Sequence, residues 1–184
     1  MKNNIMVVYK TKYGASQKCA EIVAGEFNAE LMDLSEIRSP DELGKYETVV
    51  FVAGIYAGAT NGAAKMSRII NKICKDKKEI FVFTVGNTPV ERHDILEKVR
   101  NRSVRLPARS AVQFGHFVAK ANFPTLNRWD KFILSVRRAA ILSKPENART
   151  AGELGFLKNY GKEAQPIDKE VIKKTARNII GNLS

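Results

Sequence analysis

Residues 5–17 read Ile-Met-Val-Val-Tyr-Lys-Thr-Lys-Tyr-Gly-Ala-Ser-Gln. The stretch opens with a short unbroken apolar run, which is typical of a strand buried on both faces of a parallel sheet. It continues through small and hydroxyl-bearing residues into a helical pattern over 16–27, with Ser16 placed to cap that helix. A strand, a tight bend and a helix in this order predict the first unit of a parallel α/β sheet.

Further apolar runs and helical patterns extend this unit along the chain. The additional strands are predicted at 31–34, 48–53, 80–85 and 111–118. The additional helices are predicted at 62–75, 90–101 and from Asp168 to Gly181. Strands that alternate with helices indicate right-handed βαβ connections. The sequence therefore predicts a doubly wound α/β fold with five parallel strands in the order 2-1-3-4-5.

The segment 119–166 interrupts this alternation, because connections between sheet elements are usually only a few residues long. Within it, apolar residues recur at helical spacing: Leu126, Trp129, Phe132, Ile133, Val136, Ala140 and Ile141. The other side of the same helix is basic and carries Arg128, Lys131, Arg137, Arg138 and Lys144. We expect one domain over 1–184, with 119–166 as an insertion that holds an amphipathic basic helix.

The composition indicates a globular, strongly basic chain. Of its 184 residues, 31 are Lys or Arg and 19 are Asp or Glu, a formal net charge of +12. This excess favours an anionic ligand, an anionic membrane surface or nucleic acid. Nucleic acid is the last of these alternatives, because the aromatic residues are not interleaved with the basic ones as a stacking platform requires.

Cysteines and histidines provide no pattern of a metal site or of a catalytic group. Cys19 and Cys74 form no Cys-x-x-Cys pair, so we expect two small apolar fillers. We expect His116 to be a hydrogen-bonded core residue. We expect His93 to be a surface residue, with a neighbour of a bound ligand or a proton shuttle as the alternative. A basic cluster could be a solvated rim or an anion site, and the rim is favoured: Arg100, Arg102, Arg105 and Arg109. No signal-peptide pattern or apolar run of membrane-spanning length occurs, so we expect a soluble, cytoplasmic protein.

Three loops are expected to meet at one edge of the sheet. Ligands of open parallel sheets bind outside the carboxyl ends of the strands, where the strand order reverses. Here the converging loops are 11–16, 53–58 and 86–89. The free N–H groups at a helix start attract an anion, and the hydroxyls of Thr11 and Ser16 add donors. The first loop matches neither the Walker nor the Gly-x-Gly-x-x-Gly pattern, and an ordinary helix start is the alternative.

The residues of this loop resemble the flavodoxin superfamily, which binds FMN. Thr11-Lys-Tyr-Gly-Ala-Ser16 looks like the Ser/Thr-x-x-Gly-x-Ser/Thr phosphate loop of that superfamily. Together with residues 49–58 and the Asn-Arg-Trp-Asp-Lys-Phe stretch at 127–132, it is most similar to the menaquinone-dependent protoporphyrinogen oxidases. These are flavodoxin-like proteins with a long insertion before the last helix. The resemblance implies a flavodoxin-like fold with FMN as the cofactor.

The resemblance also implies which residues hold FMN. The phosphate would be bound by Thr11, Lys12, Tyr13, Gly14, Ala15 and Ser16. One side of the isoalloxazine ring would be lined by Ala53, Gly54, Ile55, Tyr56, Ala57 and Gly58, and the other by Val85, Gly86, Asn87, Thr88 and Pro89. Tyr56 could stack on the ring or be a half-exposed loop residue. Many carrier flavodoxins have a Tyr in the loop that corresponds to residues 87–89, where this chain has Asn-Thr-Pro. Those carriers are also typically acidic, whereas this chain is strongly basic.

The implied function is that of an FMN-dependent oxidoreductase of the protoporphyrinogen oxidase type, which passes electrons from a porphyrinogen substrate to a quinone. The alternative is a flavodoxin electron carrier between redox protein partners. For the segment 126–144 three roles stay open. It could make a peripheral contact with the inner face of a membrane, grip the propionates of a porphyrinogen, or pack on the rest of the domain.

Overall fold

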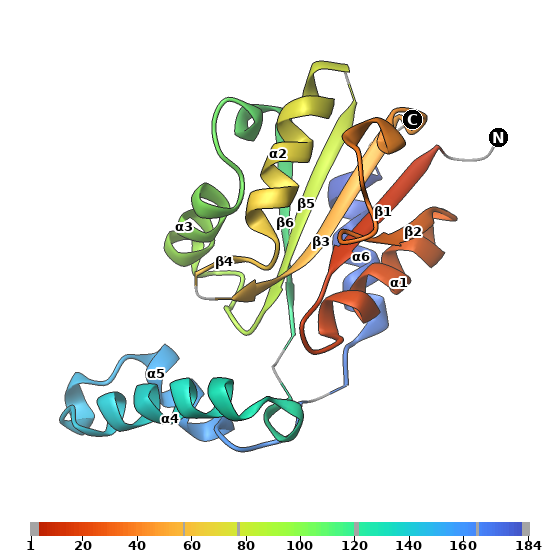
Figure 1. The fold of residues 1–184 in the computed structure, drawn as a ribbon. Helices are drawn as coiled ribbons and strands as arrows, with labels where there is room; N and C mark the ends of the chain where they lie inside the picture. The colour runs from red at the N-terminus through yellow and green to blue at the C-terminus, as the bar shows by residue number, and fades with distance from the viewer. Residues whose placement is uncertain (1–3, 57, 77, 120–121, 165, 182–184) are drawn as a thin grey trace. The chain divides into compact units, whose positions relative to one another are not determined.

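Figure 1 shows the computed structural model, which describes residues 4–56, 58–76, 78–119, 122–164 and 166–181. The chain divides into two compact units. The first, called here the sheet unit, comprises Met1–Ala119 and Pro166–Ser184, and the second, the helical unit, comprises Lys120–Gln165. Among the described residues, no helix is both long enough and apolar enough to cross a membrane.

The sheet has the predicted strand order. Its strands are β1 (Ile5–Lys10), β2 (Glu30–Asp33), β3 (Thr48–Tyr56), β4 (Ala59–Thr60), β5 (Glu79–Gly86) and β6 (Val112–Val118). The order β2-β1-β3-β5-β6, with every neighbouring pair parallel, confirms the expected five-stranded arrangement. The short β4 was not predicted, and it pairs antiparallel with the end of β3, where Ile55 lies opposite Thr60.

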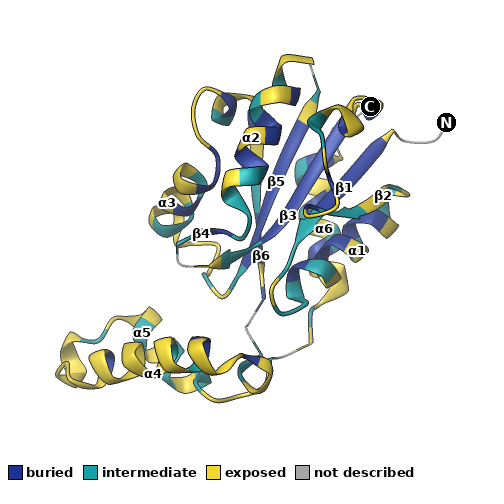
Figure 2. Cartoon of the chain, viewed as in Figure 1, coloured by how far each residue is buried: buried dark blue, intermediate teal, exposed yellow. Residues whose placement is uncertain are grey.

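Helices cover both faces of the sheet. They are α1 (Ala15–Phe27), α2 (Ala63–Ile73), α3 (His93–Ser103) and α6 (Lys169–Ile180), with the 3-10 turns η1 (Pro40–Leu43), η2 (Cys74–Asp76) and η3 (Ala108–Ala111). Successive side chains of a strand point to opposite faces. Met6 and Val8 of β1 therefore pack in the core under α2, whereas Val7 packs in the core under α1 and α6. Figure 2 shows the central strands buried between these layers.

The helical unit contains more helix than the sequence predicts. Its elements are η4 (Phe123–Thr125), α4 (Arg128–Leu142), η5 (Glu146–Ala148) and α5 (Ala151–Asn159). The expected amphipathic helix corresponds to α4, while α5 was not predicted. Each helix has a side-chain cap, because the Asn127 side chain accepts from the Asp130 N–H and Thr150 forms a capping box with Glu153.

The cysteines lie where the sequence places them. Cys19 is completely buried in the core under α1, and burial raises the pKa of its thiol to about 12. Cys74 is half-buried at the end of α2 and packs against the opposite core. In the described parts of the chain, no three His, Cys, Asp or Glu residues form a group that could hold a metal ion.

A close approach at Gly115 of β6 yields a stability prediction. A Cβ added there would clash with the Phe83 ring and would lie 2.7 Å from Ile179 Cδ1. Phe83 has little freedom to move, because its ring is stacked on Phe117 at 4.6 Å between centroids. We expect Gly115→Ala to lower the free energy of unfolding by about 1–3 kcal/mol, measured by urea denaturation.

Gly25→Ala is the matched control for this substitution. Gly25 lies on the exposed side of α1, and a Cβ there meets no atom within 4 Å. Because alanine is the better helix former, we expect a gain of up to about 1 kcal/mol. Equal effects of the two substitutions would contradict the packing described for β6.

Candidate functional site

The N-terminus of α1 is open toward the carboxyl edge of the sheet. Gly14 is the N-cap residue and has left-handed backbone geometry, with φ of 85°. No side chain caps the helix, so the prediction that Ser16 caps it is wrong. Because the chain turns at Gly14, Ser16 lies inside the first helical turn, where it is 3% exposed.

The loop before α1 is organised to receive an anion. The Gly14 N–H donates to Thr11 Oγ1 at 2.9 Å, which closes the bend. The first helical N–H groups, at 15–17, have no carbonyl partner within the helix, and the first turn contains no acidic residue. An added Cβ on Gly14 would meet nothing within 4 Å, so the space beside the bend is open. Such a helix start favours a phosphate or carboxylate.

The ends of β3 and β5 meet this loop, as the strand order predicts. A Cβ on Gly54 would lie 2.9 Å from Ser16 Oγ and 4.0 Å from the carbonyl oxygen of Val85. Glycine at position 54 therefore lets three chain segments approach one another. Next to it, a Cβ on Gly86 would lie 3.1 Å from the Cδ1 atom of Ile55, so glycine is also needed at the end of β5.

Several of the predicted loop residues belong to strands. Ala53, Gly54, Ile55 and Tyr56 continue β3, because β4 pairs with its end and extends the strand. Val85 and Gly86 are the last residues of β5, and Val85 is buried. Of the residues expected to line the isoalloxazine ring, 87–89 lie in a loop, and Ala57 lies outside the described residues.

Tyr56 and Lys12 form a cation–π contact beside the open helix start. The Lys12 Nζ atom lies 4.1 Å from the centroid of the Tyr56 ring and 5.5 Å from that of Tyr13. Tyr56 is 42% exposed, so its ring is accessible at the end of β3. The contact places a positive charge and an aromatic surface close to the anion-attracting N-terminus of α1.

Arg102, which the sequence did not assign to the site, lies beside the hairpin of β3 and β4. Arg102 of α3 reaches Gly58, where a Cβ would lie 2.6 Å from its Nη1 atom. Helix α3 also anchors the hairpin, since Ser103 Oγ accepts from the Thr60 N–H at 2.9 Å. The sequence shows only a cluster of arginines here, and nothing in their spacing separates Arg102 from a solvated rim.

His116 fixes the loop that follows β5. Its Nε2 atom lies 2.8 Å from the Thr88 carbonyl oxygen and its Nδ1 atom 2.7 Å from Thr84 Oγ1. A neutral imidazole satisfies both contacts when Nε2–H donates to Thr88 and Nδ1 accepts from the Thr84 hydroxyl. This confirms a buried, hydrogen-bonded core residue, and burial lowers the pKa of His116.

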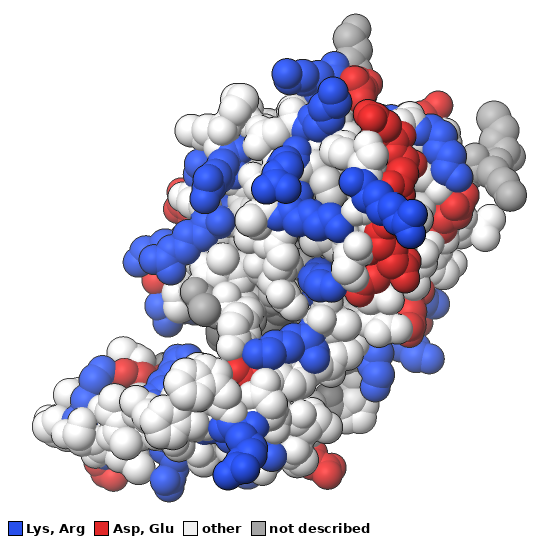
Figure 3. Space-filling model, viewed as in Figure 1, with Lys and Arg blue, Asp and Glu red and all other residues white. Residues whose placement is uncertain are grey.

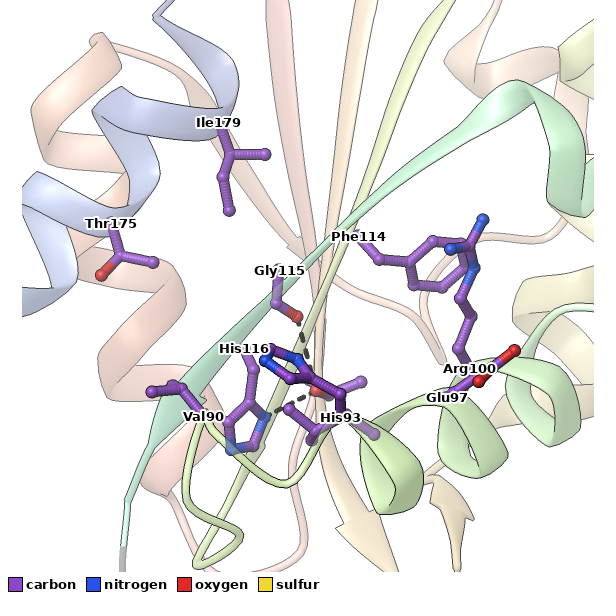
Figure 4. A pocket seen from close by; sticks show the side chains of 11 residues that line it. Val90, His93, Glu97, Arg100, Phe114, Gly115, His116, Thr175 and Ile179 are labelled. Carbon is purple, nitrogen blue, oxygen red and sulfur yellow. Dashed lines mark hydrogen bonds between the residues drawn. The ribbon is translucent and has the colours of Figure 1, made fainter.

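A pocket of about 560 Å³ lies beside the same imidazole (Figure 4). Its apolar lining includes Val90, Leu96, Phe114 and Ile179, and its polar lining includes His93, Arg100 and His116. The Arg100 guanidinium lies over the Phe114 ring at 4.4 Å. Because His116 both lines this pocket and holds Thr88, it connects the pocket with residues 87–89. His93 is exposed, as expected.

Comparison with known protein families identifies the chain. The model of a family described as flavodoxin domain matches residues 6–142, from β1 to the end of α4. The chain belongs to the flavodoxin domain family. The match covers most of the sheet unit and the first helix of the helical unit. A comparison with curated proteins gave no match.

Solved structures similar to this flavodoxin domain have low sequence identity. The Trp repressor binding protein from Bacillus subtilis is 16% identical, with a TM-score of 0.46 over 66% of this chain and 86% of that one. An archaeal flavodoxin is 18% identical, with a TM-score of 0.39 over 61% and 82%. A flavoprotein from Lactobacillus acidophilus, solved in complex with FMN, is 13% identical, with a TM-score of 0.41 over 63% and 91%.

The buried histidine gives this flavodoxin domain a testable pH dependence. Because the pKa of His116 is lowered in the folded protein, the unfolded chain binds the proton more readily below the ordinary value of about 6.5. The free energy of unfolding is therefore expected to keep its full value above that pH and to fall as the pH decreases toward the folded-state pKa. His116→Gln keeps a donor for Thr88 and should remove this part of the decrease, measured by urea denaturation between about pH 5 and pH 7.

His93→Gln is the control, because it removes the other histidine from an exposed position. In this variant the decrease assigned to His116 should persist, because His116 is unchanged. If His116→Gln also left the slope unchanged, His116 would not be the group whose protonation opposes folding.

Proposed function

We propose that this chain is an FMN-binding oxidoreductase whose cofactor phosphate binds at the N-terminus of α1. The observation that carries the proposal is the first turn of that helix, which starts behind Gly14 without a side-chain cap and without an acidic residue. A phosphate there would accept from the N–H groups of residues 15–17 and from the hydroxyls of Thr11 and Ser16.

The remaining residues of the carboxyl edge fit a flavin ring. Tyr56 offers an exposed aromatic surface at the end of β3, and residues 86–89 offer backbone polar groups after β5. His116 holds the second of these segments through the Thr88 carbonyl. The ring would therefore lie between the exposed Tyr56 side chain and a segment held by the hydrogen bond of His116 to the Thr88 carbonyl.

The protein groups supply orientation and charge. When bound, FMN supplies the transfer of electrons. Lys12 over the Tyr56 ring and Arg102 beside Gly58 place positive charge near the loops, which favours the anionic, reduced form of the flavin. Acidic carrier flavodoxins would oppose that form by repulsion.

Within this function we assign a porphyrinogen as electron donor and a quinone as acceptor. The support is the resemblance of residues 11–16, 49–58 and 127–132 to the menaquinone-dependent protoporphyrinogen oxidases. The net charge of +12 also suits the propionate groups of a tetrapyrrole, which Arg and Lys bind through charge-assisted hydrogen bonds. The second candidate is an electron carrier between proteins. The exposure of Tyr56 favours it, because a flavin beside an exposed side chain would be accessible to a protein partner.

The first test is an absorbance titration with FMN followed by addition of protoporphyrinogen and a menaquinone analogue. We expect a bound-flavin spectrum and quinone-dependent formation of porphyrin. Bound flavin without turnover would move the assignment to the electron carrier. Failure to bind flavin would overturn the proposed function as a whole.

A matched pair of charge reversals tests whether FMN binds at the loop before α1. Lys12 and Lys18 are both exposed, but Lys12 lies in the loop before α1 and Lys18 on the helix beyond its first turn. We expect Lys12→Glu to weaken FMN binding by about tenfold, since a charge reversal a few ångströms from a phosphate costs more than 1 kcal/mol. Lys18→Glu changes the net charge equally and should weaken binding much less. Equal losses would mean that overall charge, not the loop, attracts the cofactor.

A further inference from the structure

Helix α4 presents an apolar face that the helical unit leaves uncovered. This face consists of Trp129, Phe132, Ile133 and Val136, all of them exposed, with Trp129 at 65% and Phe132 at 55%. Since each residue turns a helix by about 100°, the four side chains fall within an arc of about 100°. The Trp129 and Phe132 rings lie 5.6 Å apart, so the face is continuous. Figure 2 shows α4 exposed along most of its length.

The basic side of α4, rather than its apolar face, contacts aromatic residues of the same unit. Three cations lie over aromatic rings: Arg137 over Phe156 at 4.8 Å, Arg138 over Tyr160 at 5.2 Å and Lys131 over Phe123 at 5.8 Å. Asp130 and Ile141 are the buried residues of the helix. The helix thus contacts its unit through its basic and buried residues, and the side chains of the apolar face remain exposed.

Backbone groups at both ends of α4 also form hydrogen bonds with side chains of the helical unit. At its start, Asn127 Oδ1 accepts from the Asp130 N–H at 2.7 Å. At its end, Arg149 donates to the carbonyl oxygens of Ile141, Leu142 and Lys144 at 3.2 Å each. The ends of α4 are therefore held within the unit by side chains that do not belong to the apolar face.

Cations border the apolar face on both sides. By helical geometry, Arg128 lies just beyond one edge of the arc and Arg137 just beyond the other. Lys and Arg outnumber Asp and Glu in residues 120–165 by nine to four. Figure 3 shows uncharged side chains of this unit between Lys and Arg side chains. An aromatic and aliphatic strip with arginines along its borders is typical of a helix that lies in the plane of an anionic membrane interface.

We infer that this face of α4 binds an anionic lipid surface. Trp129, Phe132, Ile133 and Val136 enter the boundary between headgroups and acyl chains, and Arg128 contacts lipid phosphates. Arg137 keeps its contact with Phe156, but its side chain is exposed and adds positive charge at the other border. Each cation held near such a surface strengthens binding by about fivefold. The inference goes beyond the proposed redox function and does not depend on FMN, because all its residues belong to the helical unit.

Trp129 makes the inference directly measurable, since it is the only tryptophan of the chain. Its emission should report an aqueous environment in the free protein. We expect a blue shift on addition of phosphatidylcholine vesicles that contain phosphatidylglycerol, and none with phosphatidylcholine alone. The shift should weaken as salt is added, because the arginines are screened.

Phe132→Ser tests the apolar face and retains the tryptophan reporter. We expect it to weaken partition into the anionic vesicles by about tenfold, as the loss of a large buried apolar side chain predicts. Val171→Ser is the matched control, because Val171 of α6 is 56% exposed in the sheet unit and should have no role. Circular dichroism of both variants should match that of the unmodified protein.

Three results would overturn the inference. Blue-shifted emission without vesicles, unchanged by lipid, would show that another part of the chain covers the face. A blue shift that follows protein concentration, with dimers in analytical ultracentrifugation, would assign the face to a second copy. Undiminished vesicle binding of Phe132→Ser would assign the attraction to the basic surface in general.

Discussion

The left-handed backbone of Gly14 is the constraint on which the carboxyl edge of the sheet depends. A residue with a Cβ in that conformation costs about 1–2 kcal/mol, so glycine is the residue that suits the turn. The turn starts α1 at Ala15 and leaves its first N–H groups directed at the space beside the loop. It also places Ser16 inside the helix, against the glycine of β3 that brings the end of β5 close. The anion-attracting start of α1 therefore lies beside the ends of β3 and β5, where the strand order predicts that the loops converge.

Much of the sheet unit follows from the sequence because its signals are local and strong. Unbroken apolar runs such as 48–53 define buried parallel strands, and the rule for strand reversal then selects which loops converge. The hairpin formed by β4 could not be predicted, since a two-residue strand has no periodicity. The cap was assigned wrongly to Ser16 because serine is a common N-cap, whereas the N-cap position is taken by Gly14 with its left-handed backbone.

The helical unit shows the opposite balance. The period of α4 was visible, but the sequence could not decide which side of the helix its own unit would contact. That choice depends on Phe156 and Tyr160, which belong to or follow α5, a helix whose sequence carries little amphipathic pattern. Guanidinium groups pack well on aromatic rings, so the basic side can contact these rings while the apolar side remains available. Arg102 was missed for a related reason, since its contact with the hairpin is a matter of tertiary structure.

The central claim is that the N-terminus of α1 binds the phosphate of FMN. Its most direct test compares the affinities of FMN and riboflavin, which share the isoalloxazine ring and differ by the phosphate, through quenching of flavin fluorescence. Two or more charge-assisted hydrogen bonds at the helix start predict that FMN binds at least about 100-fold more tightly. Equal affinities for the two flavins would contradict the account, because the loop before α1 would then contribute nothing to recognition.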